Sequence, residues 1–414
     1  MNRWLITFLS CMTAMLAYAD PAKIYGSDVT WEVTGTKLVI GGTGIMPEFD
    51  NLNPAPWKDS RATITTLEIG AGVTTVGAKA FEDCGKLTEV VVPDNITSIG
   101  AYVFHGCEKI RTIVLSNAIT AIPDNAFNSC LALVSIVIPN KVTTIDQNAF
   151  QSCAALTNIS IPDGVTAIKD NAFSGCTALT RVNVYASTPP TLGSDVFEGT
   201  PTIYVFADLK DAYTNNNDWK ALTIQAISLT ANEGATGVYW TTYYNHGAHV
   251  SIPEGTEVYK VTLDGTSITL GRITDNIIPA GQGVLLRSTS NSISVNHAAT
   301  SGTALFTSNS LKGTETAMTN PKYGQVYVLN KVDGKLGFYK LSKTGTLSAN
   351  KAYLQTPSAS TAVGFFFDDE GVTGMEPQLR KATDASPRFD LMGRSVSDAA
   401  KGLLLVGGKK VFVK

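Results

Sequence analysis

Residues 156–178 read LTNISIPDGVTAIKDNAFSGCTA, and variants of this stretch recur along the chain at a fixed step of 23 residues. Each copy carries a cysteine, and a phenylalanine lies three residues ahead of it. The residues are Cys84, Cys107, Cys130, Cys153 and Cys176, with Phe81, Phe104, Phe127, Phe150 and Phe173. A strict period of this length is typical of a solenoid, in which one short unit stacks on copies of itself.

Each unit has the pattern of a short strand, a turn and a return segment. In residues 156–178 the apolar side chains of Leu156, Ile159 and Ile161 mark the strand, and the proline and glycine of 162–164 end it. The return segment brings Val165, Ile168, Phe173 and Cys176 back to the core. One unit cannot bury these side chains alone, so stacking buries them, at roughly 25 cal/mol per Å² of apolar surface.

The unit resembles the leucine-rich repeats of BspA-like bacterial surface proteins, which carry a strand followed by I-P and end in A-F-x-x-C. The resemblance covers about residues 64–206. In the last unit Phe197 comes one residue late and Thr200 stands near the cysteine position, as expected for a terminal repeat. The fold class that we expect is mainly β, with a leucine-rich-repeat solenoid of 23-residue units over residues 64–225.

Both ends of such a stack need a cap. Residues 20–63 contain two strand-like runs, 29–33 and 37–40, and the tryptophans Trp31 and Trp57 could cover the first coil. At the other end we expect a final strand around Ile203 and a short helix over residues 208–222, with Trp219 covering the last coil.

The cysteines of the repeat are expected to be buried thiols. Each one occupies the same position in its unit, so the five should form an inward column, where cysteine behaves as a small hydrophobic residue. Neighbouring thiols about 5 Å apart are near enough that disulfide bridges remain an alternative.

The N-terminal residues 1–19 are predicted to be a secretory signal peptide. Arg3 precedes a mostly apolar run, and Ala17-Tyr18-Ala19 has the pattern of a cleavage site. The run also contains Cys11, so a lipid anchor is an alternative. No later segment is long and apolar enough to span a membrane.

Charged residues make up 16% of the chain and the net charge is −3, which gives no reason to expect nucleic acid as a partner.

After the solenoid, residues 226–374 are expected to form a β-sandwich-like module, because apolar residues alternate in a sequence rich in Thr, Ser and Gly. Two parts of it resemble each other. Residues 257–259 (EVY) lead to 285–286 (LL), and residues 325–327 (QVY) lead to 353–354 (YL) with nearly the same spacing. This indicates an internal duplication, and two unrelated hairpins of similar sequence are the alternative.

The C-terminal residues 375–414 resemble the small β sorting domain of proteins exported by the type 9 secretion system. The motifs are FDLMGR at 389–394, KGLLLV at 401–406 and GKKV at 408–411. Phe389 stands where that family commonly has tyrosine. The resemblance implies attachment at the outer membrane by sorting rather than by a membrane span, and an ordinary small β-module is the alternative.

Catalysis and cofactors are not expected. A nucleophile elbow of the G-x-S-x-G type and a phosphate-binding P-loop are both missing from the sequence. Residues 246 and 249 are the one histidine pair with metal-like spacing, but zinc needs three or four ligands. His105 stands at a variable repeat position and is expected to be exposed. We therefore predict no catalytic, metal or cofactor-binding residue and no enzyme.

The outward positions of the repeat strand are the predicted binding site. Read down the stack they are Glu68, Val91, Val114, Val137, Ser160 and Asn183, with Arg181 in the neighbouring column. Three valines in register would form an exposed apolar stripe, and such stripes tend to mark contacts. The alternative is that β-branched residues simply favour sheet surfaces.

Two functions fit the sequence. The resemblance to BspA-like proteins implies a secreted or cell-surface protein that mediates protein–protein interaction or adhesion, with extracellular or host-surface proteins as partners. The alternative is a carbohydrate-binding or carbohydrate-active surface protein that holds glycans on aromatic residues of the 226–374 module, at positions 239, 240, 243 and 244.

Overall fold

The computed structural model describes residues 22–24, 27–234, 237–245, 247–264 and 267–298, and shorter segments from 306 to 413. The predicted signal peptide lies outside the described residues. The chain divides into two compact units, one of residues 1–227 with 246–248 and one of residues 228–245 with 249–414. The predicted domain boundaries after residues 63, 225 and 374 stay predictions.

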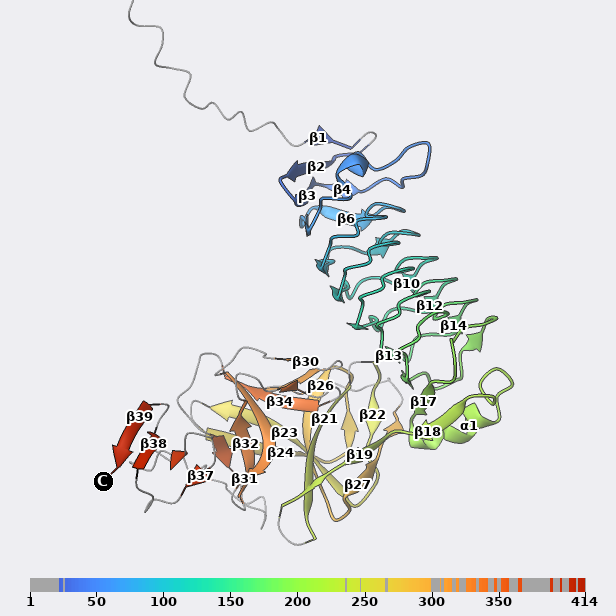
Figure 1. Cartoon of the computed structure of the whole chain (residues 1–414). Helices are drawn as coiled ribbons and strands as arrows, with labels where there is room; N and C mark the ends of the chain where they lie inside the picture. Colours follow the sequence, from blue (N-terminus) through green and yellow to red (C-terminus); the bar gives the residue numbers. More distant parts are fainter. Residues whose placement is uncertain are drawn as a thin grey trace, which may run out of the picture. The chain divides into compact units, whose positions relative to one another are not determined.

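The first unit is a solenoid of parallel strands (Figure 1). Each internal coil contributes one strand to each of two walls. Register along the first wall follows the period, so that Glu89 pairs with Thr112 and Thr112 with Ser135. The first wall consists of β5 (Thr66–Ile69), β7 (Glu89–Val91), β9 (Thr112–Val114), β11 (Ser135–Ile136), β13 (Asn158–Ile161), β15 (Arg181–Val184), β17 (Thr202–Val205) and β18 (Thr223–Ala226). The second consists of β4 (Gly44–Ile45), β6 (Val73–Val76), β8 (Ser98–Ile99), β10 (Ala121–Ile122), β12 (Thr144–Ile145), β14 (Ala167–Ile168) and β16 (Thr191–Leu192).

The core of the solenoid contains a ladder of aromatic rings that a tryptophan ends on each side. Phe81, Phe104, Phe127, Phe150, Phe173 and Phe197 stack with centroids 5.2–5.9 Å apart. Trp57 stacks on Phe81 at 6.0 Å and Trp219 lies 6.3 Å from Phe197. Each indole donates its Nε1–H to a backbone carbonyl, Trp57 to Ala80 and Trp219 to Pro190. The predicted capping by Trp57 and Trp219 is confirmed.

The N-terminal cap has the two strands that the sequence predicts. They are β2 (Val29–Thr34) and β3 (Lys37–Gly42), an antiparallel pair that β1 (Ala22–Lys23) joins on one side. On the other side β3 pairs in parallel with β5 (Thr66–Ile69), so the cap continues directly into the repeats. A short 3-10 helix, η1 (Lys58–Ser60), follows Trp57.

The C-terminal cap has less helix than predicted. The 3-10 helix η2 (Ala207–Leu209) and the α-helix α1 (Lys210–Thr214) replace the expected helix over residues 208–222. Three consecutive asparagines at 215–217 end it, because asparagine competes for backbone hydrogen bonds and disfavours helix interiors. Strand β18 after this cap was not predicted.

The cysteines form the predicted inward column of free, buried thiols. Four of the thiols donate to the phenylalanine carbonyl of the preceding coil, at 3.1–3.3 Å. Burial raises the pKa of Cys84 and of Cys130 to about 12. At neutral pH these groups are therefore protonated and poor nucleophiles.

Two corner positions of each coil have a left-handed backbone, which the sequence analysis did not foresee. One series is Lys79, Tyr102, Asn125, Asn148 and Asn171, and the other is Asp83, Gly106, Ser129, Ser152 and Gly175. Only glycine adopts positive φ without steric cost, and asparagine tolerates it better than most residues. The 23-residue step thus extends to backbone conformation.

The second unit contains two antiparallel sheets that share one core (Figure 1). Within the described residues each sheet has five strands. The first has the order β20 (Asn232–Glu233), β21 (Tyr239–Asn245), β26 (Gln282–Ser288), β23 (Thr256–Asp264) and β24 (Ser267–Ile273). The second has the order β29 (Leu311–Thr314), β34 (Lys351–Gln355), β31 (Val326–Val332), β32 (Lys335–Lys340) and β35 (Gly364–Phe366).

The order of the strands supports the predicted duplication. The hairpin β23–β24 corresponds to β31–β32, and β26 and β34 pair with the first strand of each hairpin. Tyr259 and Tyr327 take equivalent, buried positions opposite Leu285 and Leu354. Two hairpins that were alike by chance would not be expected to share these neighbours.

Smaller strand groups complete the second unit. These are β19 (Ser228–Thr230) with β27 (Ser292–Ser294), β22 (Val250–Ser251) with β25 (Ile277–Ile278) and β28 (Asn296–His297), and β30 (Met318–Thr319) with β33 (Thr346–Leu347). The tail has an antiparallel sheet of β37 (Ser395–Val396), β36 (Arg388–Phe389), β38 (Gly402–Val406) and β39 (Lys409–Val413).

Candidate functional site

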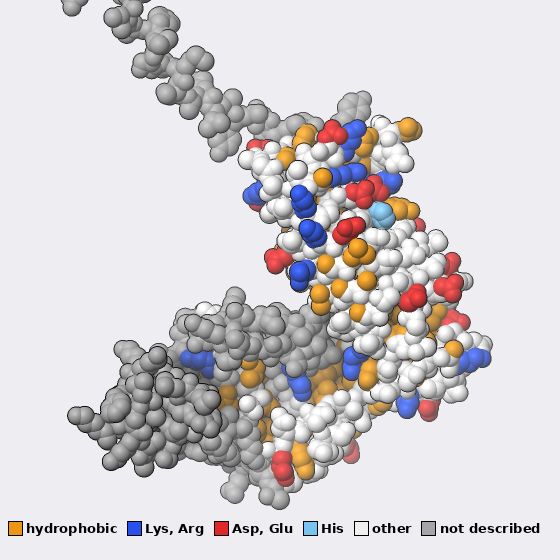
Figure 2. Space-filling view, viewed as in Figure 1, with side chains coloured by type: hydrophobic (Ala, Val, Ile, Leu, Met, Phe, Trp, Pro, Cys, Tyr) orange, Lys and Arg blue, Asp and Glu red, His pale blue; other side chains and the backbone are white. Residues whose placement is uncertain are grey.

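The middle of the first wall presents the apolar stripe that the sequence predicts. Val91 on β7 and Val114 on β9 are 60% and 58% exposed and lie directly opposite each other in the register. Val137 and Ser160 continue the column and are half-buried, whereas Glu68 at its start is exposed and forms an ion pair with Lys37. Figure 2 shows hydrophobic side chains over the middle coils and charged ones gathered over the N-terminal coils.

The end of the same column departs from the expectation. Asn183 is only 4% exposed, and it donates to the Ser160 hydroxyl at 3.1 Å and accepts from Arg181 Nε at 2.9 Å. The Arg181 guanidinium lies 3.6 Å from the centre of the Tyr204 ring. Asn183 therefore belongs to an internal polar network rather than to an exposed binding surface, and Arg181 is committed to the same network.

The second wall carries a column of exposed threonines, Thr74, Thr97, Thr120, Thr143 and Thr166. The hydroxyls of Thr97, Thr143 and Thr166 each donate to the carbonyl of the threonine one coil earlier, at 3.2–3.3 Å. Since these donors are engaged with the neighbouring coil, the column ties coils together. The first wall is the better candidate for binding because its outward valines have no such role.

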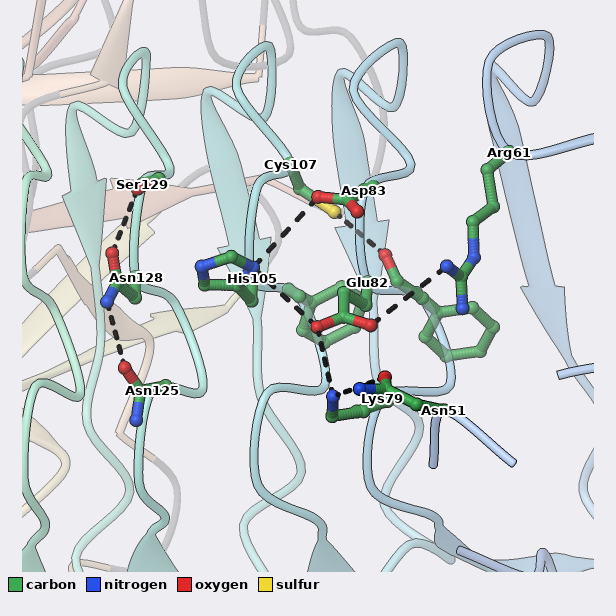
Figure 3. Close-up of polar contacts among 12 residues, drawn as sticks. Asn51, Arg61, Lys79, Glu82, Asp83, His105, Cys107, Asn125, Asn128 and Ser129 are labelled. Carbon is green, nitrogen blue, oxygen red and sulfur yellow. Dashed lines mark hydrogen bonds and ion pairs between the residues drawn. The ribbon is translucent and has the colours of Figure 1, made fainter. Parts of the chain in front are cut away.

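A charged cluster lies at the corner between the N-terminal cap and the first repeats (Figure 3). Glu82 is at its centre, with Lys79 Nζ at 3.6 Å, His105 Nδ1 at 3.9 Å and Arg61 at 4.0 Å. His105 was expected to be exposed and is half-buried, with 31% of its side chain exposed and its ring packed against Tyr102. Asp83, 4.0 Å from the same His105 nitrogen, adds a second carboxylate, so the two acids balance Lys79 and Arg61, which fits a structural role in joining the cap to the stack.

The aromatic residues proposed as a glycan platform do not form an open surface. Trp240 and Tyr243 are buried, and Tyr239 and Tyr244 are half-buried. The Tyr244 ring lies so close to Gly313 that any side chain there would collide with it. Trp240 and Tyr243 therefore pack the module, as the sequence alternative of core packing had it, and glycan binding by the module stays a prediction.

Among the described residues, His, Cys, Asp and Glu side chains nowhere gather in threes around a point that could hold a metal ion. His246, of the predicted histidine pair, lies outside the described residues. The described helices are also all too short to span a membrane.

The comparisons with known proteins concern the solenoid. The family model of the BspA type leucine rich repeat region matches residues 63–204 in six copies. The repeats of this chain are thus leucine-rich repeats of the BspA type. The matched segment is less than half of the chain, and the second unit lies beyond it. No curated protein matches the chain.

Several solved structures of leucine-rich-repeat proteins are similar to parts of this chain. A leucine rich cell surface protein from Faecalibacterium prausnitzii is 22% identical, with 53% of this chain and 58% of that chain covered and a TM-score of 0.32. A leucine rich repeat protein of T. pallidum is 22% identical, covering 48% and 94%, with a TM-score of 0.28. The pneumococcal vaccine antigen PcpA is 12% identical, covering 49% and 98%, with a TM-score of 0.23. Likenesses at this level say nothing about ligands or activity.

Proposed function

We propose that this chain is an exported surface protein whose solenoid binds extracellular or host-surface proteins by its first wall, without catalysis. The observation that carries the proposal is the exposed pair Val91 and Val114, in register on a hydrogen-bonded sheet. Apolar side chains exposed side by side are characteristic of contact surfaces. A wall of parallel strands is also rigid, so a partner loses little by ordering it.

Adhesion is the form of binding that the resemblance to BspA-like surface proteins implies, and the match of the repeats to the BspA type is in keeping with it. Because repeat surfaces diverge while the core pattern persists, the ligand itself has to be found by experiment. The buried, protonated thiols and the charges around Glu82 have structural explanations, so neither competes with the first wall as a candidate binding site.

The binding test replaces Val91 and Val114, the exposed pair, with lysine in the full-length chain. We expect binding to immobilised fibronectin or fibrinogen to fall at least tenfold, because two charges would be buried in an apolar contact. The matched control places lysines on the other wall, at Thr120 and Thr143, and should bind as the unchanged chain does.

Circular dichroism melting must show that both variants fold. If the folded valine variant binds either matrix protein as tightly as the unchanged chain, the first wall is not the binding surface. If the control variant loses binding equally, the second wall is involved instead.

Export is the second part of the proposal. It is supported by the leader-like residues 1–19 and by the sorting motifs FDLMGR and GKKV near the C-terminus. Fractionation of producing cells, with mass spectrometry of the two ends of the mature protein, tests it. We expect outer-surface material that begins at Asp20 and lacks residues 375–414; intracellular material with intact ends would contradict export.

A further inference from the structure

The first sheet of the second unit borders a groove of about 470 Å³, a size typical of small-ligand sites. The groove lies where β23, β24 and β26 come together, strands that are labelled in Figure 1. Its lining is polar. Glu257, Arg272 and Arg287 supply charge, Glu254 adds an exposed carboxylate, and Thr256 and Asn276 supply neutral groups.

The charged residues form a fixed cluster. The Glu257 carboxylate accepts from Arg287 at 2.8 Å and from the Tyr259 hydroxyl at 2.9 Å, and Arg272 lies 3.4 Å from it. Arg287 also lies over the buried Trp240 ring, 5.8 Å from its centre. The cluster therefore packs on the core of the module through Trp240, and its charged side chains line the groove.

Glu257 is held in its ionised form by its neighbours. Partial burial alone would raise the pKa of Glu257, but the hydrogen bonds from Arg287 and Tyr259 and the charges of both arginines outweigh it, so the pKa is lowered. A carboxylate that only accepts hydrogen bonds thus stands beside guanidinium groups that only donate them.

The second half of the duplication serves as an internal control. At the positions equivalent to Glu257 and Arg287 it has Gln325 and Thr356, where Thr356 donates its backbone N–H to the Gln325 carbonyl at 2.9 Å. Lys340 stands in place of Arg272. The same strand order forms there without the carboxylate–guanidinium pair, so the sheet does not require that pair.

We propose that this groove binds a neutral saccharide. The two carboxylates and two guanidinium groups balance, so the lining favours neither an anion nor a cation. Adjacent sugar hydroxyls both donate and accept, and they match an acceptor and a donor held side by side. This site differs from the predicted aromatic platform, whose Trp240 and Tyr243 are buried, and it is independent of the protein-binding wall of the solenoid.

The test applies the full-length chain to an array of neutral and uronic-acid oligosaccharides, followed by titration calorimetry with the best neutral sugar. In the key variant, Glu257→Gln with Arg287→Thr, the residues of the second half are copied into the first. We expect at least a tenfold loss of affinity, since hydrogen bonds to charged groups are lost. The matched control Lys340→Ala alters the equivalent position of the second half and should bind normally.

Several results would overturn the proposal. They are the absence of any neutral sugar bound by the unchanged chain, binding of uronic-acid sugars alone, and unchanged affinity in the double variant. Thermal melting accompanies the titration, and if the double variant does not fold, Arg272→Lys provides the second variant, because it keeps the charge and removes the planar donor geometry.

Discussion

The solenoid and the sandwich are both built by repetition, but only the solenoid keeps its residues alike. Each Phe of the ladder packs on the Phe of the next coil, and each Cys donates to the preceding coil in the same way. When equivalent residues of successive coils pack on each other, a change in one of them disturbs the contact with the next. The residue type at that position therefore stays the same along the stack. In the sandwich some equivalent positions have different partners: Glu257 is hydrogen-bonded to Arg287, whereas Gln325 is paired with Thr356. Neither residue packs on its own copy, so the two could diverge.

The prediction with the largest expected effect removes one ring from the aromatic ladder. Phe127 is fully buried between Phe104 and Phe150, so Phe127→Ala should cost about 3–5 kcal/mol. Scanning calorimetry of the full chain should show the solenoid transition at lower temperature and the sandwich transition unmoved. The matched change in the sandwich core, Phe338→Ala, should give the reverse pattern. One transition that moves with both variants would show that the two units do not unfold separately.

The second test is alkaline pH, which should affect the solenoid first. The raised pKa of Cys84 and Cys130 means that these thiols stay protonated in the fold to about pH 12, whereas the unfolded chain ionises near 9.0. Stability from these groups is fully present below pH 9 and is lost as the pH rises from there toward 12. Urea unfolding between pH 8 and 11 measures it. Equal losses in the two units would contradict the assignment to the thiol column.

The smallest test concerns the left-handed corners. Ser152 has a φ of 61°, so Ser152→Gly should relieve strain and stabilise the solenoid by about 0.5–1 kcal/mol. Gly175 has a φ of 75° in the equivalent position one coil later, and Gly175→Ala should destabilise it by about 1–2 kcal/mol. Chemical denaturation curves of the three chains decide it, and a loss of stability in Ser152→Gly would show that the hydroxyl matters more than the backbone.

The period predicted most of the solenoid because core positions follow from stacking alone. The Phe and Cys columns, the strands of the first wall and the capping tryptophans follow from which residues recur and where recurrence stops, whereas the second wall was not predicted. The left-handed corners left only a weak signal, the recurring asparagines at 125, 148 and 171, because several residue types tolerate that conformation.

Contacts between residues far apart in the chain could not be predicted from the sequence. The burial of Asn183 depends on Ser160 and Arg181, and the environment of His105 depends on Glu82 in the coil before it. The groove near Glu257 depends on a register that places Arg287 opposite it and Arg272 one strand away. The register of these strands depends on contacts throughout the sheet. Composition and spacing could therefore predict a sandwich, but not which charged residues come together at this site.

The tryptophans at the ends of the ladder close the stack without fixing its length. Because every internal coil presents the same ring above and below, removing residues 133–155 would bring Phe127 onto Phe173 and leave both closing contacts intact. The wall would then shorten by one strand spacing, about 4.8 Å. The extent of the outward surface can therefore change in whole-coil increments during evolution, and a designer could tailor its reach to a partner of any chosen width.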